Sequence, residues 1–329
     1  MRGVCGLVLL AACSLQEPGG VAAHPEPVQA VVVPAPERDV EEAPVVPAPP
    51  ALTSVTVTAD DGHALAVHHK KPARPRAALV LVHGRTWSGL PDFDLQVPGE
   101  SVSLMDALVA ADIAAYAVDL RGYGATPRDA TGFVTPRRSA ADVAAVLKFV
   151  AEDAGVRPHL LGWSMGALVS TLVAQERREL TAGLVLYGYP CRAGRPTRSR
   201  APEPTVPAKA TNTAASAASD FITPGSVSRA VVDGFVAAAL QADPIKADWR
   251  GGAEWEALDF ARLRGIPVLV IHGERDPVTN HQCMAEQFLK ISGGDRRWEI
   301  VAGGDHAAHL ERTGFAAAVI GFVLSRRGG

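Results

Sequence analysis

Ser164 is the candidate nucleophile of this sequence because of the residues that surround it. It lies at the centre of the pattern Gly-Trp-Ser-Met-Gly at 162–166, which follows a predicted buried strand at 157–161 and precedes a helix-like segment at 167–177. On a strained strand-to-helix turn of this kind, glycines allow close backbone packing and the serine hydroxyl is exposed at the edge of a sheet. A serine hydroxyl is weakly nucleophilic at neutral pH, so the chain must also supply a base.

A histidine and an aspartate in a suitable order lie further along the chain. Asp276 follows the β-branched run 268–271, and His306 follows the run 298–301; both stand in turns marked by glycine or proline. A serine becomes reactive when an imidazole takes its proton and a carboxylate orients the imidazole. We therefore expect Ser164, Asp276 and His306 to act together as a catalytic triad.

Other carboxylates are alternatives for the acid. Asp305 is adjacent to His306, but adjacent side chains of an extended segment point to opposite sides, which makes Asp305 the poorer orienter. Glu274 lies two residues before Asp276, and the sequence leaves its geometry open. Asp119 begins an Asp-Leu-Arg-Gly-Tyr-Gly turn, and we interpret it as structural because the glycines indicate a tight loop.

Acyl transfer also needs backbone N–H groups that face the negative oxygen of the tetrahedral intermediate. Met165 directly follows the serine, and its N–H is the first candidate. The N–H of Arg85 is the second, because His83-Gly84-Arg85 follows the apolar run 78–82.

With these motifs the chain resembles the α/β-hydrolase superfamily over about residues 53–326, apart from an insertion. The motifs that recur in the family's order are His83-Gly84, the turn at 119–124, the serine turn, the acid turn and the terminal histidine. Each residue alone also fits a tight turn, but the shared order favours a catalytic site. The resemblance implies a carboxylesterase acting on a small-molecule ester through an acyl-enzyme. Lipases, thioesterases, peptidases and acyltransferases share this fold, and a lipid-anchored binding or scaffold protein without turnover is the alternative.

The elements that must position these residues follow an α/β pattern. A hairpin is expected at 53–58 and 64–69, and a helix at 136–153 begins with Thr135 as N-cap and Pro136 at its first position. Further apolar runs predict strands at 78–83, 114–119, 158–162, 183–187, 267–272 and 297–301. Such alternation predicts an α/β fold with a mostly parallel central sheet and helices on both faces.

Residues 190–262 interrupt this alternation after the sixth predicted strand. The first part is rich in proline, arginine and threonine, and 216–240 has partly helical character. An insertion here would lie over the edge where ligands bind in open α/β sheets, so we expect a lid that shapes the substrate pocket. Aromatic residues are the candidates for lining the pocket, or for packing the lid on its core: Trp87, Phe221, Trp249 and Trp255.

The amino-terminal end has the pattern of an export signal. Arg2 is followed by an apolar run at 3–10, which is shorter than the roughly 20 residues that span a bilayer. The sequence Leu-Ala-Ala before Cys13 resembles a bacterial lipobox, which implies that 1–12 is a cleaved signal peptide and that Cys13 carries a lipid. An ordinary secretory signal is the alternative. We expect an exported protein, lipid-anchored to a bacterial membrane.

The domain organisation follows from these observations. The proline-rich residues 13–52 predict an extended tether, residues 53–189 and 263–329 the α/β-hydrolase core, and residues 190–262 the lid. The 329 residues are 47% hydrophobic with a net charge of −3, which suits one large domain and does not indicate nucleic-acid binding.

The remaining sequence features concern cofactors and cysteines. The sequence has no metal-ligand cluster and no glycine-rich phosphate loop between a strand and a helix, so we expect no metal and no cofactor. Besides Cys13, only Cys191 and Cys283 remain after removal of the signal peptide. A disulfide between them is permitted in an exported protein but does not follow from two cysteines.

Overall fold

The computed structural model describes residues 50–191, 202–310 and 314–325, which all belong to one compact unit, Ala48–Gly329. Its centre is an eight-stranded sheet of order β1-β2-β4-β3-β6-β7-β9-β10. Strand β2 pairs antiparallel with β1 and β4, and every other pair in this sheet is parallel. The strands are β1 (Thr53–Thr58), β2 (Ala64–Lys70), β3 (Ala77–Val82), β4 (Ile113–Val118), β6 (His159–Trp163), β7 (Leu184–Tyr187), β9 (Val268–Gly273) and β10 (Arg296–Val301).

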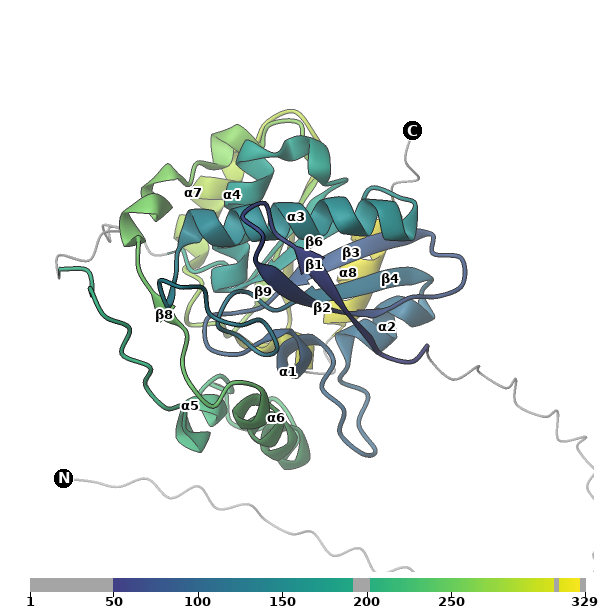
Figure 1. The fold of residues 1–329 in the computed structure, drawn as a ribbon. Helices are drawn as coiled ribbons and strands as arrows, with labels where there is room; N and C mark the ends of the chain where they lie inside the picture. The colour runs from purple at the N-terminus through teal and green to yellow at the C-terminus, as the bar shows by residue number, and fades with distance from the viewer. Residues whose placement is uncertain (1–49, 192–201, 311–313, 326–329) are drawn as a thin grey trace, which may run out of the picture. The chain divides into compact units, whose positions relative to one another are not determined.

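Helices cover both faces of this sheet (Figure 1). Alternate residues of β3 belong to different apolar clusters: Val80 and Val82 pack with α3 and α4, and Leu79 and Leu81 pack with α2 and α8. The central strands are therefore buried on both sides, which explains their nearly continuous apolar sequence. The helices are α1 (Gly89–Phe93), α2 (Leu104–Ala110), α3 (Pro136–Ala154), α4 (Met165–Glu176), α7 (His281–Lys290) and α8 (Phe315–Leu324).

The predicted α/β fold is confirmed, and each predicted strand of the sheet agrees with the structure to within one residue at either end. Helix α3 begins where its sequence predicts. The Arg138 N–H donates to the hydroxyl of the N-cap Thr135, and Gly155 ends the helix with a left-handed φ of 68°. None of the helices in the described ranges has the length and apolar character that crossing a membrane requires.

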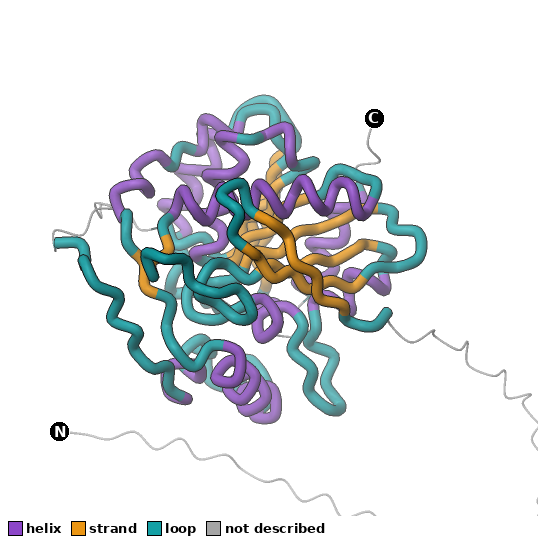
Figure 2. Tube along the Cα trace, in the orientation of Figure 1, coloured by secondary structure: helices purple, strands orange, loops and turns teal. Residues whose placement is uncertain are grey.

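The insertion (residues 190–262) lies between β7 and β9. Its described part contains α5 (Ala214–Ala218), α6 (Arg229–Ala242), β8 (Asp248–Trp249) and the 3-10 helices Gly252–Ala257 and Phe260–Leu263. Figure 2 shows that loops join most of these short elements. Strand β8 pairs with β5 (Phe133–Val134) in a small second sheet, which the sequence did not predict, and α6 packs against α1. The insertion is thus fastened to the core at both of these places.

Candidate active site

Ser164 lies on a sharp turn between β6 and α4. Its φ of 54° and ψ of −115° are unusual for a residue other than glycine, so the turn is strained. The flanking glycines are required by contact: a Cβ on Gly162 would lie 2.1 Å from the Gly166 carbonyl oxygen, and one on Gly166 would lie 2.2 Å from that of Val82. The Ser164 N–H donates to the Tyr187 carbonyl at 2.8 Å, which ties the turn to the neighbouring strand β7.

His306 lies in the loop after β10, and its imidazole Nδ1 is 3.0 Å from Oδ2 of Asp276, which follows β9. The carboxylate also accepts hydrogen bonds from the Val278 N–H at 2.8 Å and from the Thr279 hydroxyl at 3.0 Å. Burial alone would raise the pKa of Asp276, but these hydrogen bonds, that of His306 foremost, hold the pKa below its ordinary value. Asp276 is therefore an ionised carboxylate aimed at the histidine.

The structure brings His306 beside the serine turn. The indole Nε1 of Trp163, the residue before Ser164, donates to the His306 carbonyl at 2.9 Å, and the two rings lie 5.4 Å apart. Among the described residues, no hydrogen bond joins the Ser164 hydroxyl to the His306 ring. Catalytic hydrogen bonds are often long in unliganded sites and shorten when substrate binds.

The other carboxylates considered for the acid have different partners. Asp305 is buried and accepts hydrogen bonds from the Thr223 N–H at 2.9 Å and the Ser226 hydroxyl at 3.3 Å, both in the insertion. Glu274 is exposed and accepts the Gly303 N–H at 2.9 Å. Among these carboxylates, Asp276 is the one that lies within hydrogen-bond distance of the His306 imidazole.

Asp119 has a structural environment. Its carboxylate accepts the N–H groups of Gly89 and Ala125, each at 2.9 Å, and lies 3.0 Å from His68 Nε2. It thereby fastens α1 and the turn after β4 to the edge of the sheet.

The two candidate oxyanion donors lie on the wall of one pocket with Ser164. Met165 is the first residue of α4, where a helix leaves its backbone N–H groups without intrahelical partners. Arg85 follows β3, and its carbonyl is held by the Tyr123 hydroxyl, to which Trp249 Nε1 donates at 2.7 Å. In the described part of the chain, neither the Met165 nor the Arg85 N–H has a hydrogen-bond partner. Both are available to a bound oxyanion.

A family model described as serine aminopeptidase, S33, matches residues 73–313, which include the serine turn, Asp276 and His306. The chain belongs to this family. Comparison with curated proteins finds no match.

Solved structures with the same fold cover most of this hydrolase. A hydrolase from Pseudomonas aeruginosa PA01 is 23% identical, with a TM-score of 0.59 over 84% of this chain and 99% of that one. The thioesterase domain from the curacin biosynthetic pathway is 17% identical, with a TM-score of 0.56 over 83% and 99%. A thermophilic esterase from Thermogutta terrifontis is 18% identical, with a TM-score of 0.55 over 81% and 96%. These likenesses show the α/β-hydrolase fold, and with the family match they support a serine α/β hydrolase.

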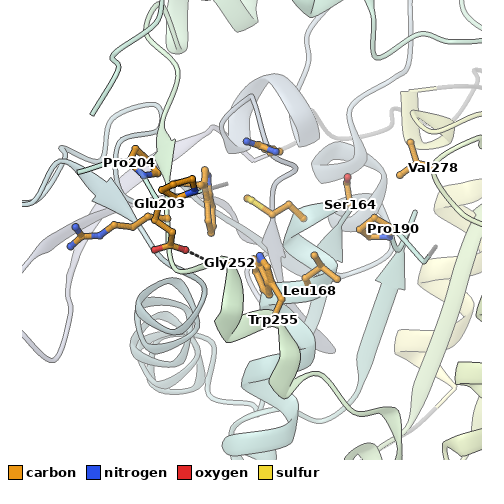
Figure 3. Close-up of a pocket in the computed structure, with 13 residues that line it drawn as sticks. Ser164, Leu168, Pro190, Glu203, Pro204, Gly252, Trp255 and Val278 are labelled. Atoms are coloured by element: carbon orange, nitrogen blue, oxygen red, sulfur yellow. Dashed lines mark hydrogen bonds between the residues drawn. The ribbon is translucent and has the colours of Figure 1, made fainter. Parts of the chain in front are cut away.

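The pocket at Ser164 has a volume of about 570 Å³, and its wall near the serine is mostly apolar. Figure 3 shows Trp255 beside Leu168, with Ser164 and Glu203 on different sides of the pocket; the Glu203 carboxylate accepts the Gly252 N–H at 2.8 Å. Trp249 and Trp255 line the pocket and stack with ring centroids 6.1 Å apart. Several further lining residues were not anticipated from sequence: Leu168, Pro190, Pro202, Glu203, Pro204, Arg250 and Val278.

Two of the aromatic candidates lie elsewhere, which corrects the sequence-based expectation. Trp87 is buried under the insertion, packs edge-on against Phe235 of α6 and donates from Nε1 to Asp220 at 2.8 Å. Phe221 also packs edge-on against Phe235. Neither lines the pocket of Ser164. These aromatic residues lie where the insertion packs on the core. Large apolar rings are buried there, and their burial stabilises the contact between the insertion and the core.

Polar contacts reinforce the same junction. Asp243, at the end of α6, accepts the Ser88 N–H at 2.8 Å and the Gly124 N–H at 2.7 Å, so that one carboxylate holds two loops of the core.

Burial raises the pKa of Asp220 to about 6, against the opposing effects of His306 and of the Trp87 hydrogen bond.

Cys191 and Cys283 form a disulfide with their Cα atoms 5.7 Å apart, which answers the question that the sequence left open. The bond joins the start of the insertion to α7, which begins shortly after the acid turn. The Asn280 N–H donates to the Cys191 carbonyl, and the Thr279 hydroxyl is near both the Tyr189 carbonyl and the Asp276 carboxylate. The disulfide therefore fastens the segment that carries the acid.

Within the described ranges, one group of carboxylates is close enough together to hold a metal ion: Asp60, Asp61 and Asp142. Arg121 binds Asp142 and Asp61 at 2.7 Å each, and Arg138 contacts the same acids, so the charges of this group are already compensated by arginine. Cys13 lies outside the described residues, and its expected lipid remains a prediction.

Proposed function

We propose that this protein is a carboxylesterase that hydrolyses a small-molecule ester through an acyl-enzyme on Ser164. The observation that carries the proposal is the hydrogen bond between His306 and the ionised Asp276, formed beside a serine on a strained turn. Because Nδ1 of the imidazole donates to Asp276, Nε2 is left without a proton and acts as the base.

In the acylation step, His306 Nε2 takes the Ser164 proton while Oγ attacks the ester carbonyl. The carbonyl oxygen becomes an oxyanion, which accepts the N–H groups of Arg85 and Met165. When the intermediate collapses, His306 gives its proton to the departing alcohol and the acyl group stays on Ser164. Asp276 stabilises the imidazolium and remains ionised throughout.

In the deacylation step, a water molecule attacks the acyl carbonyl and His306 takes its proton. Collapse of the second intermediate breaks the bond to Oγ, returns the proton to Ser164 and releases the carboxylic acid. The mostly apolar wall formed by Leu168, Trp255 and Val278 favours an acyl group without charge near the reacting carbonyl.

Labelling with a fluorophosphonate probe tests the proposal, in the wild type and in Ser164→Ala. We expect covalent labelling that is lost in the variant, and hydrolysis of nitrophenyl esters over a series of acyl lengths. Folded wild-type protein that neither reacts with the probe nor hydrolyses any ester would favour the alternative of a binding protein. A higher kcat/KM on an aminoacyl nitroanilide than on the matched ester would indicate a peptidase instead.

We also propose that the chain is exported and held at a bacterial membrane by a lipid on Cys13, with residues 13–52 as a tether. The support is the short apolar run followed by Leu-Ala-Ala-Cys in the sequence. Mass spectrometry of the mature amino terminus should find a lipid-modified Cys13, and Cys13→Ser should release the protein from membranes. An intact Met1 or an unmodified Cys13 would refute the anchor.

A further inference from the structure

The backbone carbonyl of His306 is held by side chains from two neighbouring strands. Trp163, the last residue of β6, donates from its indole Nε1 at 2.9 Å, and Tyr187, the last residue of β7, donates from its hydroxyl at 2.8 Å. The two rings stack with centroids 5.8 Å apart and are almost completely buried. His306 itself lies in a loop outside any helix or strand, so these bonds attach that loop to the sheet.

The same two residues also hold the nucleophile. Trp163 is joined to Ser164 by a peptide bond, and the Tyr187 carbonyl accepts the Ser164 N–H at 2.8 Å. Each residue therefore connects the backbone of the nucleophile to the backbone of the base. The separation of Ser164 and His306 depends on this double connection, because the two residues lie on separate loops 142 positions apart.

A third buried side chain orients the Tyr187 hydroxyl. His309 has its Nδ1 2.9 Å and its backbone N–H 3.1 Å from the Tyr187 oxygen. Burial lowers the pKa of His309 to about 3, so the ring is neutral and carries one proton. The directions of two of the bonds are fixed by their groups: the His309 backbone N–H donates to the phenol oxygen, and the phenol donates to the His306 carbonyl. The Tyr187 hydroxyl thus accepts a hydrogen bond on one side and donates one on the other.

We propose that Trp163 and Tyr187 are positioning residues that fix the His306 imidazole between Ser164 and Asp276. This inference rests on the proposed function, since it assigns His306 as the base. Displacing a catalytic group by about 1 Å can cost roughly 100-fold in rate. The ground-state pocket is formed by other residues, so the effect should fall on kcat rather than KM.

The experiment compares Trp163→Phe and Tyr187→Phe with two matched controls. Tyr189→Phe removes a phenol hydroxyl that makes no hydrogen bond among the described residues, from a buried tyrosine. Trp298→Phe removes a buried indole N–H without a partner in the same part of the chain. Turnover of a nitrophenyl ester is measured per active site, counted from the acyl-enzyme burst. The positioning variants should lose roughly 10- to 100-fold in kcat with KM within about twofold, and the controls should keep wild-type values.

Two further readouts separate positioning from a loss of stability. The pH profile of kcat/KM should change in the positioning variants and not in the controls, because a displaced imidazole loses its hydrogen bond to Asp276. The NMR signal of the His306 Nδ1 proton should shift or broaden in these variants and not in the controls. Unchanged kcat per active site together with an unchanged proton signal, even with lower thermal stability, would overturn the inference. A wild type without turnover would refute the proposed function. The His306 Nδ1 proton signal, compared between wild type and variants, would still show whether Trp163 and Tyr187 position the imidazole.

Discussion

Oδ2 of Asp276 lies 3.0 Å from Nδ1 of His306 across 30 positions of sequence, whereas Asp305, the covalent neighbour of His306, binds the insertion. Asp276→Asn should therefore lower kcat by about 10⁴-fold, because an amide no longer favours the Nδ1–H tautomer. Asp305→Asn is the comparison, and its kcat on the same ester should stay within about tenfold of wild type, with a lower melting temperature. Equal losses of kcat in the two variants would contradict the assignment of the acid.

We expect the ionised carboxylate of Asp220 to destabilise the folded protein at neutral pH, and this destabilisation to disappear in acid. Its pKa of about 6 lies above the ordinary value of 3.8, so the folded state binds more protons than the unfolded state between these values. The destabilisation by this carboxylate thus grows as pH rises from about 4 to about 6 and is constant above that. Asp220→Asn should raise the free energy of unfolding near neutral pH by roughly 1 to 2 kcal/mol, less than full linkage gives because the carboxylate is partly exposed.

Thermal unfolding of wild type and Asp220→Asn at several pH values measures this effect. The advantage of the variant should vanish below about pH 4, where the aspartate is protonated in both states. An advantage that persists unchanged in acid would show that the substitution acts through packing and not through charge.

The disulfide should contribute to stability and to the acid turn. Cys191 and Cys283 are 92 residues apart, and removing a native disulfide typically costs about 2 to 5 kcal/mol, with long loops toward the upper end. The double variant Cys191→Ala, Cys283→Ala should lose a comparable free energy of unfolding, measured by urea titration. Its kcat should also fall, since Thr279 and Asp276 lie on the segment that the disulfide fastens. A loss of stability with unchanged kcat would show that the disulfide stabilises the fold without affecting the position of Asp276.

Ser54 provides an internal comparison for the reactivity of Ser164. Its hydroxyl lies 2.7 Å from His68 Nδ1, and His68 Nε2 lies 3.0 Å from Asp119, so a second chain of serine, histidine and aspartate exists. Ser54 lies on the regular edge strand β1 and is not followed by a helix N-terminus that would stabilise an oxyanion.

A fluorophosphonate should therefore modify Ser164 and leave Ser54 unmodified. Peptide mass mapping identifies the labelled serine, and Ser54→Ala should be labelled at the wild-type rate. Modification of Ser54 would show that the three side chains suffice without the strained turn and its N–H groups.

The sheet and the residues around the serine were predictable for physical reasons. Strands buried on both faces have continuous apolar sequences. The glycines beside Ser164 are required because a Cβ on either would lie 2.1 or 2.2 Å from a backbone oxygen. The triad candidates followed from the order of turn motifs. Three features could not be predicted because they depend on tertiary packing. They are the short β5–β8 ladder, the burial of Trp87 and Phe221 away from the pocket, and the hydrogen bonds that Trp163 and Tyr187 donate to the His306 carbonyl.

The carboxylate of Asp243 limits how this scaffold can be redesigned. Because it binds the N–H groups of Ser88 and Gly124, and its own carbonyl accepts the Asn212 side-chain amide at 2.7 Å, cutting out the whole insertion would leave core loops without their acceptor. It would also expose the ring of Trp87. Libraries that seek new acyl preferences should therefore vary residues 202–204 and 249–255 and leave the stretch from 212 to 243 as a fixed frame.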